Sequence, residues 1–85
     1  MPIQNEIEQL KGKRADKKSR LDQLETRASA LLSQIRRDLG GGYVESLDDV
    51  DVAQAREGVH QLADVKKEAE KLEEQIEEIN EVLDT

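Results

Sequence analysis

The amino-acid sequence predicts an all-α protein in which two long helices fold back on each other as an antiparallel coiled-coil hairpin. Three observations lead to this fold class. Apolar residues recur at alternating spacings of three and four in both halves of the 85-residue chain, three consecutive glycines separate the halves, and aromatic residues make up 1% of the total. Because 39% of the residues are charged and 35% are hydrophobic, a thick globular core is excluded. We expect residues 1–85 to form a single helical hairpin domain.

The first half of the chain predicts a helix over residues 3–39. Arg36 and Arg37 fall in its last turn, where the helix dipole favours cations, and Gly40 follows as a C-cap. Eight of the ten positions on its heptad stripe are apolar. The ten positions are Ile3, Ile7, Leu10, Arg14, Lys17, Leu21, Leu24, Ala28, Leu31 and Ile35.

Two consecutive positions on this stripe, Arg14 and Lys17, are charged. We expect their alkyl stems to lie along the second helix while their charges reach its acidic residues. The candidates for these acidic partners are Glu68, Glu70 and Glu73. The alternative is that this stretch, which follows Gly12, is weakened so that a partner can enter.

Residues 40–48 are predicted to form the connecting loop and residues 49–84 the second helix. We favour Asp48 as its N-cap, because Leu47 and Val52 then occupy the positions of a hydrophobic staple. Eight of the nine positions on the second stripe carry apolar side chains. These nine positions are Ala55, Gly58, Leu62, Val65, Ala69, Leu72, Ile76, Ile79 and Leu83.

Two helices of nearly equal length with a short connection are expected to pack antiparallel. The predicted register pairs residues whose numbers add up to about 86. Leu24 then faces Leu62, and Ala28 faces Gly58, where two small residues would let the helix axes approach closely.

The charges of the two halves favour the same arrangement. Residues 1–42 carry a net charge of +3 and residues 43–85 a net charge of −10, so the halves attract each other when the chain doubles back. Individual surface ion pairs contribute about 0–1 kcal/mol, so their role is to specify orientation and register. The expected pairs are Arg20 with Glu68 and Lys11 with Glu73.

A second apolar strip lies beside the seam near the loop. Leu32 and Leu39 occupy e positions of the first heptad pattern, and Val52 and Val59 occupy e positions of the second. In an antiparallel pair these positions flank the same side, and two helices cannot enclose them. We expect a homodimeric four-helix bundle, or docking on another protein, to cover this strip, with Tyr43 contributing to the contact. The alternative is that the loop alone covers it.

The function predicted from these features is non-enzymatic protein–protein interaction, as a small adaptor or a self-assembling subunit. One alternative is a nucleic-acid-associated accessory protein, although the absence of interleaved aromatic residues disfavours it. Its contacts would come from the basic residues of segment 11–20, namely Lys11, Lys13, Arg14, Lys17, Lys18 and Arg20. Another alternative is a regulatory inhibitor whose acidic residues in segment 68–81 bind a basic partner.

The sequence predicts no catalytic, cofactor or metal site. Cysteine is absent, which excludes disulfides and thiol chemistry, and His60 is the single histidine, on an outer f position. The glycine run lacks the lysine and hydroxyl residue of a phosphate loop. With no apolar stretch of membrane-spanning length and no signal peptide, we expect a cytoplasmic protein that does not bind membranes.

Overall fold

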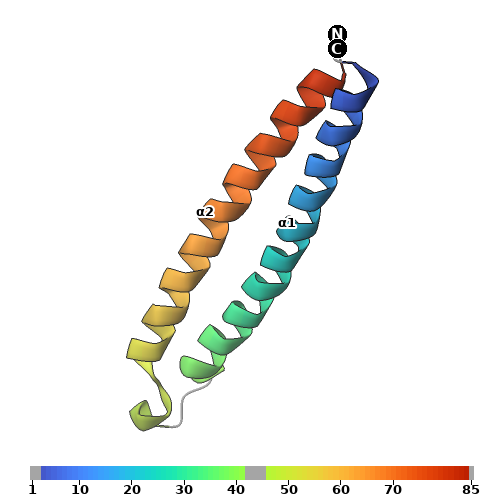
Figure 1. Ribbon diagram of the computed structural model, residues 1–85. Helices are drawn as coiled ribbons and strands as arrows, with labels where there is room; N and C mark the ends of the chain where they lie inside the picture. The colour runs from blue at the N-terminus through green and yellow to red at the C-terminus, as the bar shows by residue number, and fades with distance from the viewer. Residues whose placement is uncertain (1–2, 42–45, 85) are drawn as a thin grey trace.

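A computed structural model describes residues 3–41 and 46–84 of the chain. Helix α1 covers Gln4–Asp38, a short 3-10 turn, η1, covers Leu47–Asp49, and helix α2 covers Val52–Leu83. The two long helices lie side by side and antiparallel, with the start of α1 and the end of α2 at the same end of a rod (Figure 1). The rod measures 64 × 15 × 14 Å. The predicted all-α helical hairpin is confirmed.

Helix α1 ends where glycine was expected to end it. Arg36 and Arg37 form the last turn, and Leu39 is the C-cap. Gly40 and Gly41 follow with φ angles of 88° and 65°, in the left-handed region that glycine adopts at least cost. Their N–H groups donate to the carbonyl oxygens of Arg37 (3.0 Å) and Arg36 (2.6 Å), so the end of the helix is hydrogen-bonded.

Helix α2 begins three residues later than the sequence predicted, and the choice of Asp48 as its N-cap is wrong. Ser46 Oγ accepts the N–H of Asp48 at 3.2 Å and so caps the 3-10 turn. Asp51 Oδ1 accepts the N–H of Gln54 at 2.9 Å and caps α2. Leu47 is 86% exposed, so the expected hydrophobic staple does not form.

The register of the hairpin also differs from the prediction. The contacts that define it are Arg20 with Glu68, Asp38 with Asp51, and Ile35 with Gly58. The residue numbers of these partners add up to between 88 and 93, whereas the predicted register required about 86. The expected pairing of Ala28 with Gly58 is therefore wrong, because Gly58 lies against Ile35, seven residues farther along α1. Helix α2 also begins later than predicted, at Val52.

The core is a single row of side chains between the helices. Among the described residues, the buried hydrophobic side chains are Leu24, Ile35, Ala55, Val65 and Ile79. Most other seam residues, such as Leu21, Leu31 and Leu62, are half-buried. Each helix of a hairpin covers only one face of the other helix. A lone hairpin of this length therefore buries little apolar area.

Two helical glycines lie in opposite surroundings. Gly58 is buried against α1, and a Cβ atom added to it would lie 2.8 Å from Cγ1 of Ile35. Gly12 is exposed, and a Cβ atom there would meet nothing within 4 Å. Gly58 therefore serves the close approach of the helices, whereas Gly12 only lowers the helix propensity of α1.

This contrast predicts opposite outcomes for the same substitution. Gly12→Ala should raise the free energy of unfolding by about 1 kcal/mol, because alanine favours the helix. Gly58→Ala gains the same propensity but overpacks against Ile35, at a cost of about 1–3 kcal/mol, so it should leave stability unchanged or lower it. Urea denaturation followed by circular dichroism, at one fixed chain concentration, measures both. Equal stabilisation by the two variants would contradict the packing of Gly58.

Candidate interaction surface

The seam between the helices has two flanks of different chemistry. In the heptad pattern, g positions lie along one flank and e positions along the other. We call the first flank the g side, formed by Arg20, Arg27, Gln61 and Glu68. We call the second flank the e side, formed by Lys11, Lys18, Glu25, Leu32, Leu39, Val52, Val59, Lys66, Glu73 and Asn80.

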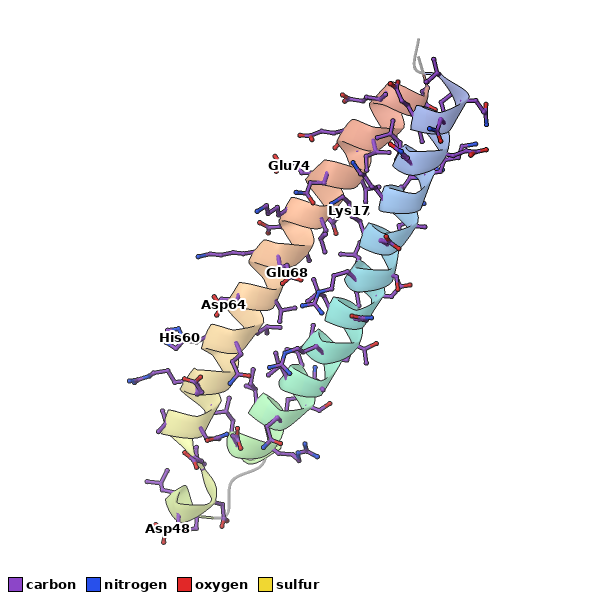
Figure 2. The ribbon with its side chains drawn as sticks, viewed as in Figure 1. Lys17, Asp48, His60, Asp64, Glu68 and Glu74 are labelled. Atoms are coloured by element: carbon purple, nitrogen blue, oxygen red, sulfur yellow. The ribbon has the colours of Figure 1, made fainter. Side chains whose placement is uncertain are left out.

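Polar pairs join the two helices along the g side, around a cavity of about 200 Å³. Arg20 Nε donates to Glu68 Oε2 at 2.7 Å, and Arg27 donates to Gln61 Oε1 at 3.0 Å. Glu68 lies in the space between the helices in Figure 2. The expected pair of Arg20 with Glu68 is confirmed. By contrast, no ion pair joins Lys11 to Glu73 within residues 3–41 and 46–84, because the shifted register moves Glu73 away from that level.

The Arg20–Glu68 pair changes the acidity of both groups. The hydrogen bond from Arg20 lowers the pKa of Glu68 below its ordinary value of 4.5, with attraction between the charges adding to it. The same hydrogen bond raises the pKa of Arg20. Both side chains remain about half exposed, so solvent screens the interaction.

The charged seam positions form a polar layer nearer the chain ends. Arg14 donates to Asn80 Oδ1 at 2.8 Å, and Lys17 Nζ donates to Gln75 Oε1 at 3.0 Å. Figure 2 shows Lys17 between the two helices. The expected partners Glu68, Glu70 and Glu73 are therefore wrong for these two residues, which bond to neutral amides instead. The layer gives each cation one amide acceptor but interrupts the apolar seam.

The basic side chains of segment 11–20 lie on different sides of helix α1. Arg14, Lys17 and Arg20 donate to side chains of α2, whereas Lys11, Lys13 and Lys18 are exposed. Lys11 and Lys18 belong to the e side, and Lys13 lies on a g position. The structure therefore does not gather these six residues into one basic patch.

Near the loop the e side is apolar, and the described residues leave it about half exposed. Its four apolar side chains are about half exposed: Leu32 43%, Leu39 45%, Val52 57% and Val59 52%. The N–H of Asp51 donates to the carbonyl oxygen of Asp38 at 2.7 Å, which keeps the neighbouring residues Leu39 and Val52 within one helical turn of each other along the rod. Leu47 points to solvent, and Tyr43 lies outside the described residues.

A groove of about 310 Å³ continues this surface toward the middle of the rod. Glu25 and Lys66 border it on the e side, and only apolar atoms face it. Its remaining lining residues are Leu24, Ala28, Leu62, Val65 and Ala69. The sequence reasoning missed this groove. The signal was present in Ala28 and Ala69, whose small side chains occupy seam positions that larger residues fill elsewhere.

The other polar candidates lie away from the seam. His60 is exposed and points away from α1, and Asp48 lies in the 3-10 turn at the tip of the rod (Figure 2). Asp64 and Glu74 project from the outer surface of α2 in the same view. These side chains are solvated surface groups of the hairpin.

The Arg20–Glu68 pair predicts a specific pH dependence. Because folding lowers the pKa of Glu68, its contribution to stability is present above about pH 4.5 and is lost as pH falls through the lowered value. Glu68→Gln should therefore be less stable than the parent near neutral pH, and the difference should vanish in acid. Thermal unfolding between about pH 7 and pH 2 measures this convergence. Glu74→Gln is the matched control, and convergence of equal size there would contradict the assignment.

Three further findings concern metals, membranes and relatives. In the two described ranges, no three His, Cys, Asp or Glu residues gather closely enough to hold a metal ion. Within the same ranges, neither helix combines the length and apolar character needed to cross a bilayer. No protein-family model matches the chain, and no curated protein or solved structure is significantly similar to it.

Proposed function

We propose that this protein acts by protein–protein contact rather than catalysis, as a self-assembling subunit. Two hairpins would pack their e sides together and form a four-helix bundle. The observation that carries this proposal is the uncovered apolar surface, in which four half-exposed side chains continue into an apolar groove. The residues that we assign to the contact are Leu32, Leu39, Val52 and Val59, together with the loop residue Tyr43.

The thin core of the hairpin supports this function. A rod 15 Å wide has one row of buried side chains, and the described residues leave the apolar e side in contact with water. Fully burying a Val or Leu side chain contributes about 1.5–3 kcal/mol, so completing the burial of each half-exposed residue contributes about 1 kcal/mol. Association at the e side therefore supplies the apolar area that one hairpin lacks.

The same surface would also serve a small adaptor subunit that docks on a different protein. An amphipathic helix with an apolar stripe fits beside two antiparallel helices as a third member of the bundle. We favour self-association because it needs no further component and buries two copies of the strip at once. The mass of the protein in solution distinguishes the two possibilities.

The two alternative functions receive less support. Three of the six basic residues proposed for nucleic-acid contact donate to α2, which directs their charges into the hairpin. The inhibitor alternative depends on the negative charge of segment 68–81 alone, and Glu68 already pairs with Arg20.

Charged residues placed on the e side should dissociate the assembly. The double variant Val52→Glu, Val59→Glu is expected to be a folded monomer, because the carboxylates would be buried at the contact. Light scattering coupled to size-exclusion chromatography gives the mass, and circular dichroism confirms the helices. The double variant Ala53→Glu, His60→Glu places the same charges on adjacent f positions and should associate like the parent. A parent that is monomeric at high concentration, with the Val52/Val59 variant unchanged, would exclude self-association.

A further inference from the structure

We infer that the e side binds a second copy of this chain in the same orientation, with both loops at one end and the two-fold axis parallel to the helices. Helix α1 of each copy then packs against α2 of the other copy. This inference rests on the proposed self-assembly and adds the orientation of the copies and the ion pairs between them.

The e positions of the two helices form pairs at successive levels of the rod. Glu25 and Lys66 border the same groove, and the bond between Asp38 and Asp51 keeps Leu39 within one helical turn of Val52 along the rod. The residue numbers in each of these pairs add up to 91, and further pairs follow every seven residues. The pairs are Leu39 with Val52, Leu32 with Val59, Glu25 with Lys66, Lys18 with Glu73, and Lys11 with Asn80.

Four of these pairs match in chemistry. The two nearest the loop are apolar on both helices, the third joins Glu25 to Lys66, and the fourth joins Lys18 to Glu73. When two hairpins meet in the same orientation, an e position of α1 faces the e position of α2 from the other copy at the same level. Each matched pair then forms twice across the interface, because the axis is two-fold.

The charges on the e side make no bond between the two helices of the hairpin. Among the residues that the structure describes, no side-chain hydrogen bond or ion pair engages Lys18, Glu25 or Glu73. Lys66 lies 4.0 Å from Glu70, in an exposed contact along α2. On the g side, by contrast, side chains from the two helices already bond to each other. The e side therefore keeps its complementary charges for a partner.

A dimer with the loops at opposite ends would not bring the matched e positions together. With the loops at opposite ends and the rods fully overlapped, α2 would pack against α2 of the other copy. Lys66 would then face its own counterpart, and Val59 would face Glu73. Sliding the rods until only their apolar strips overlap would leave the grooves and the charged e positions uncovered. The burial of apolar surface and the pairing of charges therefore both favour the dimer in which the two loops lie at one end.

A mixing experiment with charge-reversal variants tests the inference. In Glu25→Lys or Lys66→Glu, two like-charged pairs replace two attractive pairs of the homodimer, so we expect the dissociation constant of each variant to rise about tenfold. An equimolar mixture of the two variants should associate like the parent, because the new lysine of one chain meets the new glutamate of the other. Sedimentation equilibrium measures all three samples.

Glu74→Lys and Lys67→Glu are the matched controls, since they reverse charges on neighbouring f positions, and both should associate like the parent. Failure of the mixture to recover would overturn the inferred orientation, while dissociation of the Val52/Val59 variant would still support the proposed function. A monomeric parent would overturn both.

A distance measurement tests the orientation directly. The chain contains no cysteine, so Asn5→Cys, on an exposed f position near the start of α1, accepts a single nitroxide label. If the two copies are oriented with both loops at one end, the two labels of a dimer lie together at the other end. Their separation is then much less than the 64 Å length of the rod. Double electron–electron resonance should therefore give a short distance. A separation near or above the rod length would overturn the inference.

Discussion

The structure depends on one geometric constraint: two helices can enclose a single row of side chains between them. Leu24 and Val65 fill the middle of that row, and Ile35 with Ala55 fill it near the loop. The chemistry of the surface beside this row depends on the residues at the e and g positions that flank it. Polar pairs join the two helices on the g side, whereas the e side is apolar near the loop and its charges farther along make no bond to the opposite helix. The molecule is therefore asymmetric about its own seam.

The loop determines which residues face each other. The hydrogen bond from Asp51 to Asp38 closes the base of the loop, and Asp51 also caps α2. Helix α2 therefore starts at Val52, three residues later than local preference suggested. In this hairpin Arg20 bonds to Glu68, the partner that the sequence predicted, and Glu25 and Lys66 border the same groove.

The polar layer of Arg14 and Lys17 divides the rod into two parts. Their bonds to Asn80 and Gln75 give each cation one amide acceptor but put hydrophilic atoms where an apolar row would continue. The exposed apolar residues of the e side all lie on the loop side of this layer. In the proposed assembly these apolar residues would supply most of the affinity, and the charged e positions would contribute to orientation.

The sequence by itself determined the two helices, the glycine break and the apolar e positions, because heptad spacing and glycine act locally and do not depend on packing. It also identified Arg20 and Glu68 as partners, since flanking charges tolerate a small error in register. Only the tertiary structure decided the start of α2, the amide partners of Arg14 and Lys17, and the groove beside Ala28. Ser46, Asp48 and Asp51 are N-caps of similar strength, so local preference could not choose among them. The register, too, was decided only by the packed helices, in which Ile35 lies against Gly58 and Asp51 bonds to Asp38.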